Sequence, residues 1–310
     1  MNALACTALA LITASGAGHA SWNASPGGER EATRRIYRRV LERASDREHR
    51  KILQTDLSVD DRDWSTAVEI SSRYYVVKTT NPIHGRRLGS SLDRQLERMQ
   101  ELLQTSYTPP RPFPVWILPT VQEYSTLGEA SDEHSSFYAS YYSPNDPGRP
   151  VICLYSLKQN TFDVLHSAVH QYVDAAFPRR IRKTWISEGL AHYLCLNVSE
   201  HYRDWASAQH SLKIPRYTPL SSLVHEEGLG RFGNSTQASV RLLQLALLFR
   251  FLLEELPDTA RDELEPEASF AVYLREVLEG REPRDGFQSL FLTNRGMSDL
   301  DQMFREFRFD

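Results

Sequence analysis

The order of two hydrophobic patterns along the chain limits its fold most strongly. Between residues 67 and 156, β-branched and aromatic residues form short runs that end at Pro, Asn or Gly. After residue 156, apolar residues recur at helical spacing. Strands followed by helices are typical of an α+β protein, whose helices gather on one side of a mainly antiparallel sheet. We therefore expect an α+β fold, with a small mainly antiparallel sheet followed by a helical subdomain.

The individual segments support this order. The strand pattern occupies residues 68–80, 109–120, 135–144 and 149–156, and one amphipathic helix interrupts it at residues 88–107. The later helices are expected at Thr161–Phe177, Trp185–Leu196, Thr236–Leu256, Phe270–Glu279 and Met297–Phe307.

The N-terminus differs from the rest of the chain. Residues 1–20 are small and apolar and end in Gly18-His19-Ala20, which predicts a signal peptide and an extracytoplasmic, periplasmic or secreted protein. A disordered or weakly helical tail is the alternative. Residues 21–64 are interpreted as a linker and a basic surface helix. Residues 65–310 then form one domain, with strands in 65–156 and helices in 157–310.

Composition excludes several classes of partner. The chain has a net charge of −4, 41% hydrophobic and 25% charged residues, which is typical of a globular protein with no general affinity for nucleic acid. After the N-terminus no apolar run is long enough for a stable membrane span. Cys153 and Cys195 remain once the signal peptide is removed. Either they form a disulfide or, as we favour, they are two small buried hydrophobes.

Two histidines four residues apart are the first chemical signal. His166 and His170 lie in the sequence TFDVLHSAVHQYVD, and positions i and i+4 of a helix lie on the same face. Two imidazoles can therefore point at one metal ion. Because the chain contains 10 histidines, this spacing alone is a weak signal.

The segment TWISEGLAHYL, residues 184–194, adds a carboxylate. A short turn after the first helix makes the second helix antiparallel to it, which brings Glu188 near the histidines. Two histidines, a glutamate and a water form a catalytic zinc set. Gly189, beside the carboxylate, would allow a neighbouring helix to approach closely.

The two segments together resemble a known family. H-x-x-x-H-Q followed by W-I-S-E-G-L-A-x-Y is similar to the gluzincin zinc metallopeptidases of the peptidase MA-like superfamily, and closest to a bacterial domain family of unknown function. The likeness covers roughly residues 65–308 and is strongest in 161–194. It implies a zincin-like fold, a peptide or protein substrate or partner in the cleft, and one zinc ion held by His166, His170 and Glu188.

The sequence departs from that family at two positions. Ser167 occupies the position of the glutamate that acts as general base, and a serine hydroxyl cannot take a proton near neutral pH. Losing a general base typically costs about 10²–10⁴-fold in rate. The second departure is the absence of a tyrosine between Tyr217 and Tyr273, where the family often stabilises the oxyanion; Leu242 lies near that place. A lost oxyanion donor costs on the order of 10²–10³-fold.

Several neighbouring residues allow two interpretations. Asp163 is either a substitute base or a carboxylate favoured at a helix N-terminus. His192 is either a partner of Glu188 or, as we favour, an exposed helix histidine. Trp185 and Tyr193 are assigned to the core. A solvated loop is favoured for the basic residues Arg179, Arg180, Arg182 and Lys183.

Three functional hypotheses follow. The first is a gluzincin-like protein that retains its metal site and has lost most of its peptidase activity. The second is an active zinc hydrolase with a different general base. The third is a metal-free structural or binding domain.

Overall fold

The computed structural model describes residues 63–119, 140–141, 148–154, 160–177, 184–198, 212, 217–224, 235–255, 270–281 and 297–307. The expected signal peptide, the basic helix and the basic loop lie outside these residues. None of the described helices is long and apolar enough to cross a membrane. The chain divides into two compact units, a sheet unit within residues 1–93, 111–143 and 147–168, and a helical unit within 94–110, 144–146 and 169–310.

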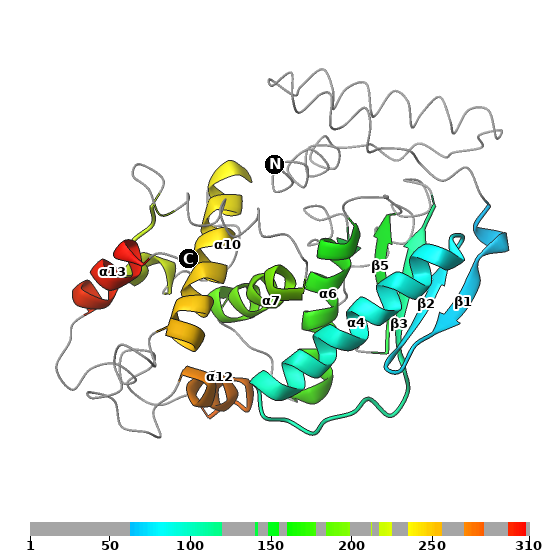
Figure 1. The fold of residues 1–310 in the computed structure, drawn as a ribbon, viewed down its shortest axis with the longest axis horizontal. Helices are drawn as coiled ribbons and strands as arrows, with labels where there is room; N and C mark the ends of the chain where they lie inside the picture. Colours follow the sequence, from blue (N-terminus) through cyan, green and yellow to red (C-terminus); the bar gives the residue numbers. More distant parts are fainter. Residues whose placement is uncertain are drawn as a thin grey trace, which may run out of the picture. The chain divides into compact units, whose positions relative to one another are not determined.

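The sheet unit contains a five-stranded sheet with the strand order β1-β2-β3-β5-β4. Figure 1 shows β1, β2, β3 and β5 side by side. Strands β1 and β2 are antiparallel, as are β4 and β5, whereas β2 pairs with β3 and β3 with β5 in parallel. The strands are β1 Val68–Ser71, β2 Tyr75–Thr79, β3 Phe113–Leu118, β4 Ser140–Tyr141 and β5 Val151–Leu154.

The α+β class is confirmed, but the expectation of a mainly antiparallel sheet is wrong, because the sheet is mixed. Helix α4, Pro82–Leu102, connects β2 to β3. A helical crossover returns the chain to the end of the sheet where the previous strand began, so the next strand runs parallel to it. The register shows this directly, since Tyr75 at the start of β2 lies opposite Phe113 at the start of β3.

The single strand expected over residues 68–80 is a hairpin, and a carboxylate from α4 stabilises its turn. Asp93 accepts hydrogen bonds from Ser72 Oγ at 2.9 Å, from Arg73 N at 2.9 Å and from Tyr74 N at 3.0 Å. Hydrogen bonds to a charged acceptor are stronger than those between neutral groups. Asp93 therefore holds the β1–β2 turn against α4.

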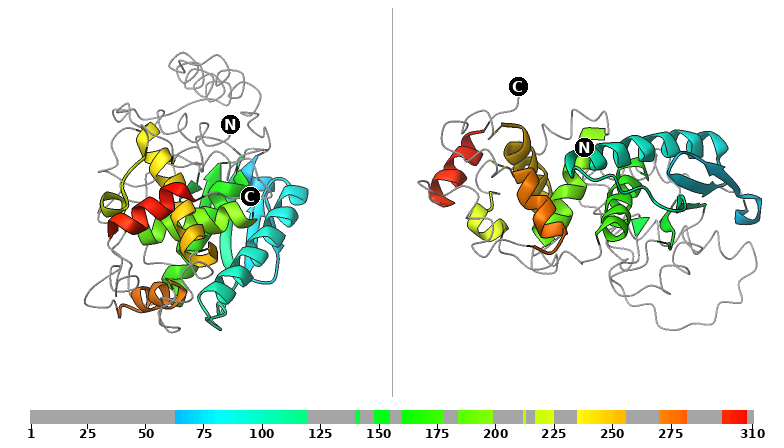
Figure 2. Two further views of the ribbon diagram at one scale, coloured as in Figure 1. Left: turned by 60° about the vertical axis from the view of Figure 1, so that its left-hand side comes forward. Right: turned by 90° about the horizontal axis from the view of Figure 1, so that it is seen from below.

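Helix α4 begins earlier than the sequence predicts because Asn81 and Pro82 start it. The Asn81 side chain accepts a hydrogen bond from His84 N at 3.1 Å, and proline suits the first helical position. At Gly85 an added Cβ would lie 2.6 Å from Ile70 Cδ1. This first part of α4 therefore packs directly on the hairpin, and Figure 2 shows the helix running along the strands.

The helices after the sheet agree with the expected positions, with ends that differ by a few residues. One difference is that the expected helix 236–256 ends in a π-helical turn, η4. The boundary between the two units falls after residue 168, within the continuous helix α6. The first turns of α6 therefore belong to the sheet unit and its last turns to the helical unit. The helices are α6 Asn160–Ala176, α7 Thr184–Val198, α9 Leu220–Leu223, α10 Ser235–Arg250 with η4 Phe251–Glu255, α12 Phe270–Leu278 and α13 Met297–Glu306.

An aromatic cluster forms the core of the helical unit. The ring centroid of Trp185 lies 6.1 Å from that of Phe249 and 6.3 Å from that of Phe270. Trp185 is buried, as expected. Cys153 and Cys195 are also buried and are not joined in a disulfide, which confirms the interpretation as small hydrophobes.

Candidate metal centre

The predicted site residues lie on two consecutive helices. His166, Ser167 and His170 belong to α6, and Glu188 lies one turn after the start of α7. His166 and Ser167 are each 5% exposed. The side chains of His170 and Glu188 are 26% and 12% exposed. The two helices therefore present their polar residues in a largely dry environment.

His170 and Glu188 lie close together, as the sequence predicts. The distance between His170 Nε2 and Glu188 Oε1 is 3.5 Å. This is at the outer limit for a hydrogen bond. Two ligands of a tetrahedral zinc ion, each bonded at 2.0–2.1 Å, are ~3.4 Å apart. The observed separation fits an ion pair between the imidazole and the carboxylate, and it also fits two ligands of one ion.

His192 is a site residue that the sequence interpretation missed. The favoured interpretation of His192 as an exposed helix histidine is wrong, because its side chain is buried, with 7% exposure. Ligand atoms of His166, Glu188 and His192 all lie within 4.8 Å of one another, and His170, which the sequence predicts as a ligand, is not part of this group. The signal in the sequence was the spacing: Glu188 and His192 are four residues apart on α7, as His166 and His170 are on α6.

A hydrogen bond fixes the orientation of the His192 ring. His192 Nδ1 lies 3.1 Å from the main-chain oxygen of Glu188. Because a carbonyl oxygen can only accept, Nδ1 carries the hydrogen and Nε2 keeps its lone pair. Metal-bound histidines usually hold their second ring nitrogen in this way.

Burial also prepares His166 for metal binding. Desolvation by burial lowers the pKa of His166 to about 4, so that its imidazole is neutral at neutral pH. Neutral imidazole is the form that coordinates a metal ion. The ring is stacked on Phe162, with centroids 6.5 Å apart.

Ser167 and Leu242 stand where the family resemblance implies a base and an oxyanion donor. The Ser167 side chain is buried on α6, and Leu242 is a buried apolar residue of α10. The side chain of Asp163, the substitute considered for the base, lies outside the described residues. Glu188 is the carboxylate of the clustered group, and a carboxylate that held an ion there would not be free to act as the base.

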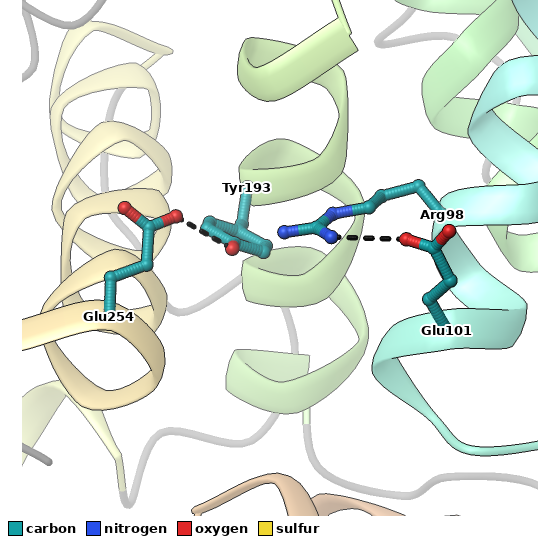
Figure 3. Close-up of polar contacts among 4 residues, drawn as sticks. All are labelled: Arg98, Glu101, Tyr193 and Glu254. Carbon is teal, nitrogen blue, oxygen red and sulfur yellow. Dashed lines mark hydrogen bonds and ion pairs between the residues drawn. The ribbon is translucent and has the colours of Figure 1, made fainter.

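Tyr193, next to His192, anchors α7. Its hydroxyl donates a hydrogen bond to Glu254 Oε1 at 2.8 Å, and Glu254 belongs to the π-helical turn η4. Figure 3 shows Arg98 of α4 on the other side of the Tyr193 ring, with its guanidinium bonded to Glu101 at 3.1 Å. Tyr193 is buried, as expected. Through Tyr193, α7 is therefore tied to η4.

Gly189 allows α7 and α10 to approach closely. An added Cβ would lie 2.7 Å from Phe249 Cδ2 and closer still to Cε2. Real Cβ contacts essentially never fall below 3.0 Å. The expectation that this glycine accommodates a neighbouring helix is confirmed, and α10 is the neighbour.

No protein-family model matches the chain, and no curated protein matches it significantly. The structure itself defines a buried group of two histidines and a glutamate, with a third histidine beside the glutamate, that could bind a metal ion.

Proposed function

We propose that the chain is a gluzincin-like zinc metallopeptidase relative that keeps a zinc site and has lost most of its hydrolytic activity. The observation that carries this proposal is the position of Glu188, 3.5 Å from His170 and grouped with His166 and His192. Imidazole nitrogens with one carboxylate oxygen are a donor set that suits zinc.

The residues around the site explain the proposed loss of activity. When bound, zinc would polarise a substrate carbonyl and acidify a water molecule. Proton transfer would still need a base, and Ser167 cannot supply one. Replacing that base by serine is expected to reduce hydrolysis by about 10²–10⁴-fold. Leu242 offers no donor to an oxyanion, which lowers the expected activity further.

The remaining parts of the proposal rest on the sequence. Residues 65–310 form the zincin-like domain, a predicted signal peptide directs it out of the cytoplasm, and a peptide or protein is its ligand. Binding of such a ligand without efficient cleavage is the activity that we propose for it.

The first experiment measures the metal content of the purified full chain by mass spectrometry. We expect about one zinc per chain in the wild type and none in His166→Ala/His170→Ala. His84→Ala is the matched control, because it removes a histidine of α4 and should keep the zinc. Circular dichroism verifies that each variant is folded. Folded wild-type protein that stays free of zinc after reconstitution would contradict the proposal.

The second experiment restores the base. Ser167→Glu should produce zinc-dependent cleavage of a mixed peptide library, whereas Ser167→Gln, of similar size, should not. No gain in a folded, zinc-loaded Ser167→Glu protein would show that the serine is not what limits hydrolysis. Efficient cleavage by the wild type would instead favour an active hydrolase with another base.

A further inference from the structure

We propose that the zinc ion is held by His166, Glu188 and His192, and that His170 lies outside the coordination sphere as a supporting partner of Glu188. The inference rests on the proposed function, because it concerns the zinc ion proposed there. It replaces one histidine of the ligand set that the family resemblance implies. Three protein ligands leave the fourth position of the ion for a water molecule, as in catalytic zinc sites.

The grouping of the ligand atoms is the first argument. Ligand atoms of His166, Glu188 and His192 all lie within 4.8 Å of one another, and His170 is not part of this group. Donor atoms on one tetrahedral zinc ion are ~3.4 Å apart. Small side-chain rotations are therefore enough to bring these three donors onto one ion.

The placement of two donors on one helix is the second argument. Glu188 and His192 are four residues apart on α7, so their side chains lie on the same face of that helix. The hydrogen bond of 3.1 Å between His192 Nδ1 and the main-chain oxygen of Glu188 holds the ring and leaves the lone pair on Nε2. Because both residues belong to α7, their spacing does not depend on how other helices pack.

Burial is the third argument. His166 and His192 are 5% and 7% exposed, and Glu188 Oε2 is buried as well. The side chain of His170 is 26% exposed. Attraction between an ion and its ligands is stronger where water is scarce. The three buried side chains therefore offer an ion a drier site than a set that includes His170.

The contact between His170 and Glu188 gives His170 its role. His170 Nε2 lies 3.5 Å from Glu188 Oε1. A neutral imidazole has one N–H group that can donate to a carboxylate, and carboxylates that bind a metal ion are usually hydrogen-bonded by a further residue. A carboxylate has two oxygens, so Oε1 can face His170 while Oε2 binds the ion. His170 is thus a positioning residue that orients Glu188.

This ligand set agrees with the role assigned to position 167. His166 remains a ligand, and Ser167 follows it directly on α6. The fourth position of the ion stays open to water, and Ser167→Glu would supply a base for that water. Restored cleavage by Ser167→Glu is therefore expected with His192 as the second histidine ligand.

The test exchanges single histidines for cysteine in the full chain and measures X-ray absorption of the zinc-loaded proteins. A thiolate ligand adds a zinc–sulfur bond of about 2.3 Å, which is distinct from bonds to nitrogen or oxygen at about 2.0–2.1 Å. We expect sulfur coordination in His192→Cys and none in His170→Cys. The wild type, whose Cys153 and Cys195 are buried, is the control and should show none.

Zinc affinity, measured by competition with a chelator, provides a second readout. His192→Ala removes a ligand and should weaken binding by more than about 100-fold, whereas His170→Ala should weaken it by about 10–100-fold, as for a supporting partner. His170→Gln should recover most of that loss, because its amide N–H can donate to Glu188. Circular dichroism verifies that each variant is folded.

The outcomes separate this inference from the function on which it rests. Sulfur coordination in His170→Cys, or a larger loss of affinity in His170→Ala than in His192→Ala, would overturn the inference and leave the zinc site intact. Folded wild-type protein that binds no zinc would overturn both. If His192→Cys binds zinc without sulfur, the order of the two alanine variants decides the question. If the His192 variants do not fold, the coordination in His170→Cys decides it.

Discussion

The two units each direct a carboxylate from one helix at another part of the chain, and the surroundings of the two carboxylates differ. In the sheet unit, Asp93 accepts three hydrogen bonds of 2.9–3.0 Å from the β1–β2 turn. In the helical unit, Glu188 lies beside imidazoles, and the distance to His170 is 3.5 Å. Asp93 is held by donors at hydrogen-bond distance, whereas Glu188 has neighbours at the spacing of metal ligands.

The neighbours of a carboxylate, rather than the carboxylate itself, determine which role we propose for it. Main-chain N–H groups and a hydroxyl are donors, so they complete the hydrogen bonding of Asp93. Each imidazole near Glu188 has, when neutral, one lone pair that can bind a cation, besides an N–H group that can donate to a carboxylate. From this difference we expect metal removal to lower the free energy of unfolding only in proteins that keep Glu188, and to do so whether or not Asp93 is present.

Removal of the metal should have the largest effect. At free zinc about 1,000 times the dissociation constant, binding to the folded state alone adds about 4.1 kcal/mol to the free energy of unfolding. A chelator should abolish this in the wild type and in Asp93→Asn, and should have no effect on Glu188→Gln. Urea unfolding with and without chelator measures it. If the zinc-loaded and the chelated wild type are equally stable, the proposed difference between Glu188 as a metal ligand and Asp93 as a hydrogen-bond acceptor would be contradicted.

Replacement of Asp93 should have the second-largest effect on stability. Asp93→Ala removes the acceptor for two main-chain N–H groups and a hydroxyl, and we expect a loss of about 1–3 kcal/mol in the free energy of unfolding. Because the site residues are unchanged, zinc content should stay at the wild-type value. A variant that loses its zinc while remaining folded would contradict the separate roles assigned to Asp93 and Glu188.

Two glycines test the packing within each unit, Gly189 in the helical unit and Gly85 in the sheet unit. Gly189→Ala meets the rigid ring of Phe249 and should destabilise by about 1–3 kcal/mol. Gly85→Ala meets the terminal methyl of Ile70, which can rotate away, and Cγ2 of the buried Thr79 at 2.8 Å. Thr79 is less free to move, because its Oγ1 accepts a hydrogen bond from Asn81 N at 3.1 Å. Alanine also favours a helix over glycine by about 1 kcal/mol. We therefore expect a smaller loss of stability at Gly85 than at Gly189, and thermal unfolding of both variants provides the comparison. A larger loss at Gly85 would contradict it.

The smallest effect should be a change in how the stability of the protein depends on pH when His84 is replaced. Burial, and then the charge of Arg87, lower the pKa of His84 from its usual value of 6.5. The unfolded chain therefore binds more protons than the folded one as the pH falls below about 6.5, and stability falls with it. His84→Gln should lose less stability than the wild type between pH 7 and 5, measured in the presence of chelator. Identical slopes would show that His84 does not contribute.

The helices were predictable because their apolar periodicity is local. The expected helices after residue 156 agree with α6, α7, α10, α12 and α13, apart from their ends. The sheet was less predictable, since strand direction depends on where α4 returns the chain. The hairpin within residues 68–80 was read as one strand because Ser72, Arg73 and Tyr74 carry no strong turn signal, and the turn is held by Asp93 from another element.

The sequence by itself determined that His166 and His170 share one face of α6 and that Glu188 and His192 lie four residues apart on α7, because both spacings follow from the helical repeat. Only the tertiary structure decided that His192 belongs to the same group, since burial depends on which helices cover α7. The close approach of α10 at Gly189 is part of that cover. Periodicity shows which side chains share a face, and packing determines whether that face meets water or other side chains.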